Sequence, residues 1–260
     1  MLKVDGIEKS YSQGGLFSKH RQQVLKQVTF ECQQGECLGI IGESGSGKST
    51  LGRLILGIER PDRGTISLDG KDVQDRRVRM GNLSAVFQNY TSSINPFLTV
   101  EAAIMEPMQA QQKLRKDQGN SEKVDLLLNQ VGLDSSYRSK YPHELSGGEA
   151  QRVCIARAIS TAPKLIVFDE AISSLDVSVQ IQVLQLLKEL KEIYKLSYVF
   201  ITHDIQAAAY ICDRVIIFRE GQVVEIVPTK QLKDVQSDYA KRLLKHLNRF
   251  HNTLSCFNQG

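Results

Sequence analysis

The chain contains two patterns of hydrophobic and polar positions: segments that are half apolar and half polar, and short runs that are continuously apolar. Near the amino terminus, residues 2–11 and 24–33 are half apolar and half polar, as in antiparallel strands with one solvated face. Short apolar runs bounded by turn residues follow at 36–42, 83–89, 164–170 and 197–202. Such runs predict strands that are buried on both faces, as in a parallel sheet.

Helical spacing alternates with these runs. Residues 49–58 predict a helix directly after the first run and its glycine- and serine-rich turn. A longer helix is predicted from Val177 to Tyr194, and a short one begins at Asp204. From Thr99 to about Ser160 the pattern is helical, and we expect it to be broken by Pro107, Gly119, Gly132 and Pro142.

Two hairpins complete the pattern, one over 64–73 with Asp69 and Gly70 as its turn and one over 214–226. Strands that alternate with helices predict an α/β protein with a mainly parallel sheet. We expect an N-terminal antiparallel β subdomain and an α-helical subdomain inserted at about residues 95–160. The main domain should cover residues 1–235, followed by a basic helical tail at 236–260.

Composition narrows the class of protein only slightly. The chain has 260 residues, of which 41% are hydrophobic and 24% charged, as is usual for a globular protein with a large core. No stretch reaches about 18 apolar residues, and the first residues lack the apolar core of a signal peptide, so a cytoplasmic chain is expected. Five scattered cysteines without a C-x-x-C pair favour reduced thiols, and a net charge of +4 does not indicate nucleic-acid binding.

The clearest local motif is Gly42-x-x-x-x-Gly47-Lys48-Ser49, placed between an apolar run and a helix. This is the P-loop pattern, in which glycines let backbone N–H groups surround a phosphate. The start of the helix adds its positive end, Lys48 reaches the β- and γ-phosphates, and the Ser49 hydroxyl ligates Mg²⁺. The motif therefore predicts a P-loop NTPase core.

A second motif is the run "LIVFDE", which ends in Asp169 and Glu170. Apolar runs that end in acids are common and mean little alone. In a P-loop protein, however, the first acid holds Mg²⁺, and the second can orient or deprotonate the attacking water. We therefore assign Asp169 to the metal and Glu170 to the water.

Four more stretches make the pattern specific: "LSGGE", "SSLD", "ITHD", and Gln88 at the end of "AVFQ". With them the sequence resembles the ATP-binding subunit of an ABC transporter, from about Leu2 to Ile226. The resemblance implies Tyr11 as the aromatic that stacks on adenine, and Gln88 as the Q-loop residue near Mg²⁺ and the water. It implies Asp176 in the D-loop and His203 as the switch residue at the γ-phosphate. The Walker A loop is then Gly42, Glu43, Ser44, Gly45, Ser46, Gly47, Lys48, Ser49 and Thr50.

Ser146 and the glycine pair that follows it, Gly147 and Gly148, form the core of the signature motif in this resemblance. It implies that two ATPase subunits pack head to tail, so that the signature of one meets the ATP on the Walker A loop of the other. Glu149 and Ala150 stand where glutamines are usual in the family. We expect the charge of Glu149 to weaken closure on ATP modestly.

Several stretches resemble the oligopeptide, dipeptide and nickel import group, including "GLFSKHRQQVLKQV", "SSINPFLTV" and "DYAKRLL". The resemblance implies the second, shorter ATPase type, with Mg²⁺ and ATP as cofactors. It implies a paralogous or identical second ATPase, two membrane permeases, and indirectly an extracellular solute-binding protein. The protein would act at the cytoplasmic face of the membrane, and its cargo could be a peptide, nickel, or another metal, free or chelated. Residues 89–97 are expected to take up a short cytoplasmic permease helix.

Two alternatives remain. A soluble ABC ATPase acting on DNA or ribosomes would share this chemistry. However, the chain lacks long heptad coiled coils and carries one Walker A motif only. Co-purification with permeases, rather than with DNA or ribosomes, separates these classes. A metal site at His246, His251 and Cys256 is disfavoured by their spacing on the basic tail, whose default is a solvated helix face.

Overall fold

A computed structural model describes residues 1–12, 21–88, 93–112 and 120–244. The amino-terminal part is a four-stranded antiparallel sheet with the order β2-β1-β4-β5. Its strands are β1 (Leu2–Ser12), β2 (Arg21–Cys32), β4 (Arg63–Leu68) and β5 (Lys71–Asp72). Asp69 and Gly70 form the turn between β4 and β5 with φ of 51° and 76°, the left-handed pair that a tight hairpin requires.

The second sheet has six strands in the order β10-β9-β3-β8-β7-β6. Five of them run parallel, and β10 pairs antiparallel with β9 at one edge. The strands are β3 (Cys37–Ile41), β6 (Leu83–Phe87), β7 (Leu165–Asp169), β8 (Ser197–Thr202), β9 (Arg214–Arg219) and β10 (Gln222–Pro228).

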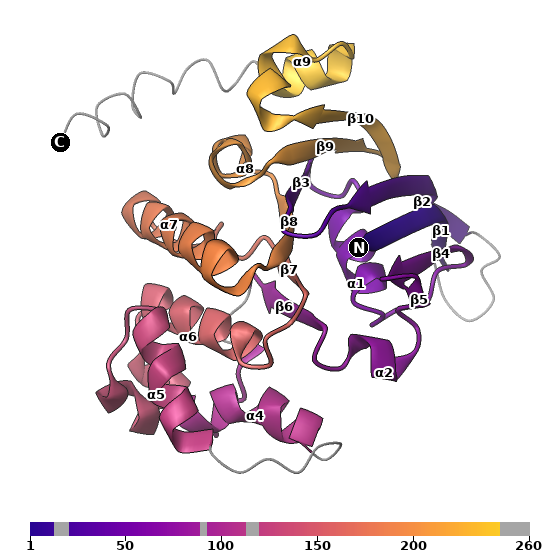
Figure 1. Ribbon diagram of the computed structural model, residues 1–260. Coiled ribbons are helices and arrows are strands. Elements are labelled where there is room, and N and C mark those ends of the chain that lie inside the picture. The colour runs from indigo at the N-terminus through magenta and orange to yellow at the C-terminus, as the bar shows by residue number, and fades with distance from the viewer. Residues whose placement is uncertain (13–20, 89–92, 113–119, 245–260) are drawn as a thin grey trace.

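Helices cover this second sheet and extend from one end of it (Figure 1). They are α1 (Lys48–Ile55), α2 (Arg76–Arg79), α4 (Val100–Gln112), α5 (Asn120–Gln130), α6 (Gly147–Ile159), α7 (Val177–Tyr194), α8 (Ile205–Ile211) and α9 (Asp238–Leu244). The described residues also include 3₁₀ segments: η1 (Ser135–Ser139) and η2 (Pro142–Glu144) between α5 and α6, and η3 (Thr229–Asp234) between β10 and α9. We call α4, α5, η1, η2 and α6 together the helical lobe.

Alternate residues of the parallel strands enter two different cores. Leu38, Ile40 and Val199 belong to a buried cluster with α1 and the antiparallel sheet. Phe168 and Tyr198 belong to a second cluster with α6, α7, α8 and the helical lobe. A strand turns successive side chains to opposite faces, so a continuous apolar run serves both cores at once.

The predicted α/β architecture is confirmed, and two elements, Val177–Tyr194 and Ser197–Thr202, begin and end where the sequence predicts. The predicted break at Pro107 is wrong, because Pro107 lies inside α4. A proline there removes one helical hydrogen bond, but Ala103, Ile104 and Met108 of the same helix are buried in the core and hold it together. Gly119 and the tail beyond Leu244, with His246, His251 and Cys256, lie outside the described residues, and the division into domains stays a prediction.

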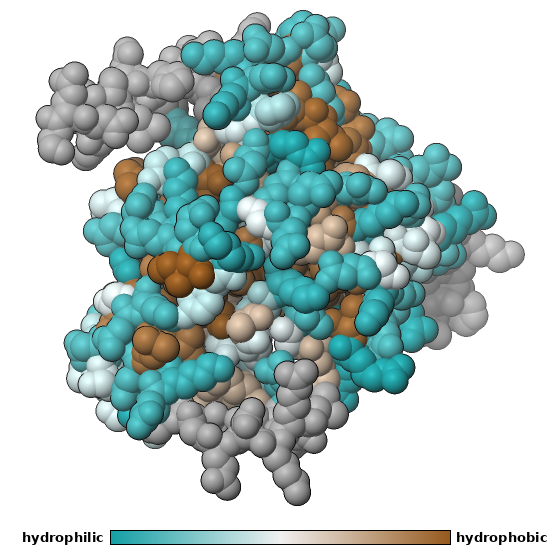
Figure 2. Space-filling view, viewed as in Figure 1, coloured by the Kyte–Doolittle hydropathy of each residue, from teal (hydrophilic) through white to brown (hydrophobic). Residues whose placement is uncertain are grey.

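The surface of the face shown in Figure 2 is mostly hydrophilic, with hydrophobic residues in small separate patches. Within the described ranges, no helix has the length and apolar character needed to cross a membrane.

Candidate functional site

Four adjacent parallel strands end at one edge of the six-stranded sheet. Ile41 pairs with Thr202 between β3 and β8, while Asp169 of β7 pairs with Ile201 of β8 and with Phe87 of β6. The residues that follow these strand ends are the glycine loop at 42–47, His203, Glu170 and Gln88. Ligands bind outside the carboxyl ends of strands in open parallel sheets, so this edge is the candidate site.

The loop at 42–47 joins β3 to α1 and depends on glycine at particular places. A Cβ at Gly42 would lie 2.0 Å from the backbone oxygen of Phe218, so no other residue fits there without moving β9. Gly45 and Gly47 have φ of 78° and 103°, and Gly47 is the residue that caps α1. The loop is anchored at its far side, because Gly221 N donates to Ser46 O at 2.9 Å.

Lys48 folds back over this loop. Its Nζ donates to the backbone oxygens of Gly42 at 2.8 Å and Glu43 at 2.9 Å, and the residue is only 5% exposed. Burial lowers the pKa of Lys48, an effect opposed by the nearby carboxylates of Glu170 and Asp169. The result is a cation held at the mouth of the loop.

Ser49 and Asp169 connect the loop to the end of β7. The Ser49 hydroxyl donates to Asp169 Oδ1 at 2.9 Å. Asp169 is 9% exposed, and burial raises its pKa, while the hydrogen bond from Ser49 acts in the opposite direction. A hydroxyl and a carboxylate therefore share one small volume beside the loop.

Glu170 is fixed by its backbone. Its φ of 52° is rare for a residue other than glycine and turns the chain sharply after β7. Glu170 N donates to Ile201 O at 2.9 Å, and Ser173 donates to the Glu170 oxygen through both its backbone N–H and its hydroxyl. Strained backbone that is held by such hydrogen bonds is common at functional sites. Here the fixed backbone of Glu170 limits the directions in which its carboxylate can point.

His203 lies against this carboxylate. Its Nδ1 is 2.7 Å from Glu170 Oε2, although the two groups are not aligned as a hydrogen bond. The His203 side chain remains 59% exposed, whereas that of Glu170 is 15% exposed. In this pair the carboxylate is therefore largely buried, and the imidazole is exposed to solvent at the rim of the site.

The residues at this edge fit a polyphosphate and a divalent cation. The Ser46 Oγ is buried, and no hydrogen-bond partner for it lies among the described residues. The first N–H groups of α1 point to the same loop, since the first turn of a helix has no internal acceptors for them. Ser49 and Asp169 offer hard oxygen donors, the kind that Mg²⁺ prefers.

The remaining predicted residues are Tyr11, Gln88 and Asp176. Tyr11 is at the end of β1, where its hydroxyl donates to Glu59 and Lys9 lies over its ring at 5.5 Å. Gln88 is exposed directly after β6. Asp176 is exposed at the start of α7 and makes no side-chain cap, while Gln180 Nε2 holds the preceding turn by donating to Ile172 O and Leu175 O.

The signature residues cap α6 in the helical lobe, and Figure 1 shows α6 well separated from α1. Ser146 Oγ accepts from Glu149 N at 3.4 Å, and Glu149 Oε2 accepts from Ser146 N at 2.7 Å. This is a reciprocal capping box, and the spacing S-x-x-E announces it in the sequence. Sequence reasoning treated Glu149 only as an unusual charge and missed this structural role, as well as its second partner, Tyr137.

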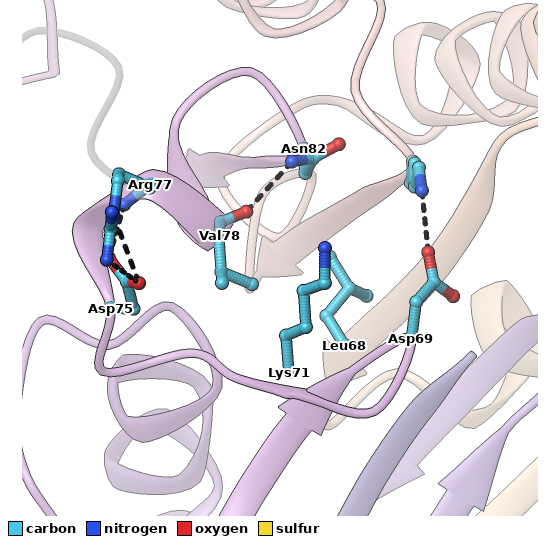
Figure 3. Close-up of a pocket in the computed structure, with 8 residues that line it drawn as sticks. Leu68, Asp69, Lys71, Asp75, Arg77, Val78 and Asn82 are labelled. Carbon is cyan, nitrogen blue, oxygen red and sulfur yellow. Dashed lines mark hydrogen bonds and ion pairs between the residues drawn. The ribbon is translucent and has the colours of Figure 1, made fainter.

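Two cavities differ in character from the strand-end site. The one in Figure 3, about 460 Å³, lies at the opposite edge of the sheet between the β4–β5 hairpin, α2 and the start of β6. Its Lys164 pairs with Asp69 at 2.6 Å and its Arg77 with Asp75 at 3.1 Å, so most of its positive charge is already neutralised. A second cavity of about 400 Å³ lies beside β6 and α6, lined by Ala85, Val86, Phe87, Ser93, Cys154 and Arg157.

A glycine loop between a buried strand and a helix, a buried lysine, and a serine–aspartate pair at the neighbouring strand end define a P-loop nucleoside triphosphatase. The family model described as "ABC transporter" matches residues 25–173. The chain belongs to the ABC transporter family, as an ATP-hydrolysing subunit of an importer.

Curated relatives match over most of their length. The metal-staphylopine import system ATP-binding protein CntF of Staphylococcus aureus (strain NCTC 8325 / PS 47) is 49% identical, over 94% of this chain and 98% of its own. The nickel import ATP-binding protein NikE of Escherichia coli (strain K12) is 37% identical, over 95% and 93%. The oligopeptide transport ATP-binding protein AppF of Bacillus subtilis (strain 168) is 39% identical, over 90% and 74%.

Among solved structures, the fold resembles a dimeric, post-hydrolysis ATP-binding cassette bound to ADP and phosphate. The TM-score is 0.78 at 29% identity, covering 88% of this chain and 99% of the other. Family membership therefore brings ATP use, membrane permease partners and pairing with another ATPase subunit.

Proposed function

We propose that residues 42–50 bind the phosphates of ATP, and that Ser49 and Asp169 hold its Mg²⁺, with Gln88 nearby. Lys48 supports this role because it is buried at the mouth of the loop, and because the nearby carboxylates of Glu170 and Asp169 favour its charged form. When bound, Mg²⁺ would neutralise charge on the phosphates. Tyr11 would stack on the adenine. Its place near the end of β1 supports this role.

In this proposal Glu170 accepts the proton of the attacking water and His203 contacts the γ-phosphate. The close approach of His203 to Glu170, at 2.7 Å, carries the assignment, because it brings a general base and a hydrogen-bond donor to one point beside the loop. The left-handed backbone of Glu170 fixes this base relative to β7 and Asp169.

We propose that Ser146, Gly147 and Gly148 act on ATP bound by the other ATPase, and that Asp176 lies at the same subunit boundary. Ser146 is exposed at the start of a 13-residue helix, where its hydroxyl and the unpaired amides can meet an anion from outside. The separation of α6 from α1 in Figure 1 supports the proposal that a second chain completes each site. Whether that chain is a copy or a paralogue is decided by the subunit composition of the purified complex.

The cavity beside β6 supports permease docking next to Gln88. Arg157 donates to Ser93 O at 2.9 Å and pairs with Glu106, which shapes one wall. Phe97 follows Ser93 by four positions in the chain and is 87% exposed, an apolar side chain that suits a buried contact with a permease helix. Residues 89–92 lie outside the described residues.

Crosslinking tests this docking in the assembled complex. Ser93→Cys should form a disulfide or short chemical crosslink to a permease, whereas Ile193→Cys, exposed at 65% on α7, should not. Equal crosslinking by both variants, or none by Ser93→Cys, would contradict the docking site.

For cargo, we propose a transition metal carried by a small organic chelator. The support is the identity of 49% to a metal-staphylopine import protein over nearly the full length, against 37% and 39% to nickel and oligopeptide proteins. The cargo does not contact an ATPase subunit, so the test has to be made in cells.

Cells that lack this protein should accumulate less of a transition metal such as nickel, measured by mass spectrometry, when the metal is supplied with the chelator. The wild-type gene should restore uptake and a Glu170→Gln copy should not. Normal metal content together with lost growth on peptides as the nitrogen source would overturn the metal assignment and favour peptide import.

A further inference from the structure

Tyr137 of η1 reaches the signature cap from outside α6. Its hydroxyl donates to Glu149 Oε1, while the other oxygen of the same carboxylate, Oε2, accepts from Ser146 N at 2.7 Å. The carboxylate is therefore a bridge between a tyrosine 12 residues earlier in the chain and the backbone of the signature serine. Both of its oxygens are engaged by donors of this chain.

The tyrosine is itself fixed in place. Lys140 Nζ lies 3.7 Å from the centroid of the Tyr137 ring, a cation–π contact, and Lys140 O accepts from Val100 N of α4 at 2.9 Å. Arg138, the next residue in η1, pairs with Glu101 of α4 and with Asp125 of α5. The ring of Tyr137 packs against the large core cluster. The hydroxyl therefore stands on a segment tied to two helices.

We propose that Tyr137 is a positioning residue for ATP hydrolysis, which acts through Glu149 to hold Ser146 and the first amides of α6 in place for the nucleotide of the partner ATPase. This inference rests on the proposed action of the signature on a second chain. Donors that face an anion are effective only when they are already oriented. A carboxylate held on two sides keeps the Ser146 amide in a single arrangement.

The same contacts answer the concern that Glu149 repels ATP. With one oxygen on the Tyr137 hydroxyl and the other on the Ser146 amide, the negative charge is directed at local donors. The Ser146 hydroxyl accepts from Glu149 N, which leaves its own hydrogen available to donate to an incoming phosphate oxygen. Without the tyrosine hydroxyl, Glu149 would gain rotational freedom and its charge could approach the phosphate.

The test uses the assembled transporter with Tyr137→Phe, which removes only the hydroxyl and keeps the ring packed against the core cluster. The matched control is Tyr194→Phe, because the Tyr194 hydroxyl makes a comparable bond to Gln130 between α7 and α5, away from the signature. We expect Tyr137→Phe to raise the KM for ATP about threefold to tenfold, the range for the net contribution of an ordinary hydrogen bond, because the hydroxyl acts on the nucleotide only through Glu149. ATP binding by the isolated subunit should not change, since the half-site acts on another chain.

A second readout separates this inference from the proposed function. In a Glu170→Gln background, the complex should retain labelled ATP through gel filtration, and Tyr137→Phe should reduce that retention while Tyr194→Phe does not. If the Glu170→Gln complex retains no ATP, the proposed hydrolysis mechanism fails. If it retains ATP equally with both tyrosine variants, the role of Tyr137 is overturned.

Glu149→Ala provides an independent arm that does not depend on how Tyr137→Phe folds. We expect it to raise the KM for ATP in the same way, and the double variant with Tyr137→Phe to be no worse than Glu149→Ala alone, because the tyrosine acts through the carboxylate. Losses that multiply in the double variant would show that Tyr137 acts by another route and would overturn the proposal.

Discussion

Ser49 and Asp169 are 120 positions apart in the chain, and the hydroxyl of the first donates to the carboxylate of the second at 2.9 Å. The contact joins the start of α1 to the end of β7 without any other side chain between them. It brings two oxygen ligands to the side of the glycine loop where Lys48 is buried. Two oxygen donors that suit a divalent cation are therefore brought together from two distant motifs.

Metal dependence should follow this pair. EDTA should abolish the ATPase activity of the assembled transporter and added Mg²⁺ should restore it, while Ser49→Ala should require a higher Mg²⁺ concentration for half-maximal rate. Asp169→Asn should lower kcat by about a hundredfold or more, as expected when a metal ligand of a phosphoryl-transfer site is lost. The control is Asp69→Asn, since Asp69 forms an exposed ion pair with Lys164. This variant should leave the Mg²⁺ titration unchanged.

Glu170→Gln should nearly stop turnover while leaving ATP binding intact. General-base catalysis contributes about 10²- to 10⁴-fold, so kcat should fall by that order while the Kd for ATP changes little. Single-turnover hydrolysis in the assembled complex measures the loss. Turnover at the wild-type rate would show that another group activates the water.

Gly42→Ala should disrupt the loop by collision alone. The added Cβ would lie 2.0 Å from Phe218 O, a backbone atom that cannot move independently of β9. We expect loss of ATP binding, measured by titration with a fluorescent analogue, and a lower Tm. Gly6→Ala is the comparison, because an added Cβ at Gly6 would have no atom within 4 Å. The φ of Gly6 is 60°, so this variant should lose only about 1–2 kcal/mol of stability, from the left-handed backbone. Normal ATP binding by Gly42→Ala would contradict the packing described for the loop.

The Glu149 bridge predicts a pH-dependent contribution to stability. Hydrogen bonds from Tyr137 and from the Ser146 backbone lower the pKa of Glu149 from 4.5 to about 2. A depressed pKa means that the stabilisation is fully present above pH 4.5 and disappears as the pH falls towards 2. The difference in Tm between wild type and Glu149→Gln should therefore be constant from pH 7 to 5 and shrink below that. A difference that grows on acidification would have the wrong sign for this bridge.

Much of the fold follows from local pattern. The apolar runs at 36–42, 164–170 and 197–202 favour strands covered on both faces, and alternation with helices then favours a parallel sheet. Pro107 shows where local pattern fails, because burial of neighbouring residues in α4 outweighed the lost hydrogen bond. The short α2 and the 3₁₀ segments were not predicted, since elements of three to six residues carry too few positions to show a period.

By itself, the sequence determined the chemistry available to this protein: a loop whose glycines fit a phosphate, a lysine, two acids after a buried strand, and a serine and two glycines at the start of a helix. Tertiary structure alone decided which groups meet. Ser49 contacts Asp169, His203 lies against Glu170, and Tyr137 holds Glu149. The reason is physical: period and propensity act over a few neighbouring residues, whereas these contacts depend on sheet order and on how the helical lobe packs. The charge of Glu149, which looks like a defect in the sequence, became part of the cap once Tyr137 was placed beside it.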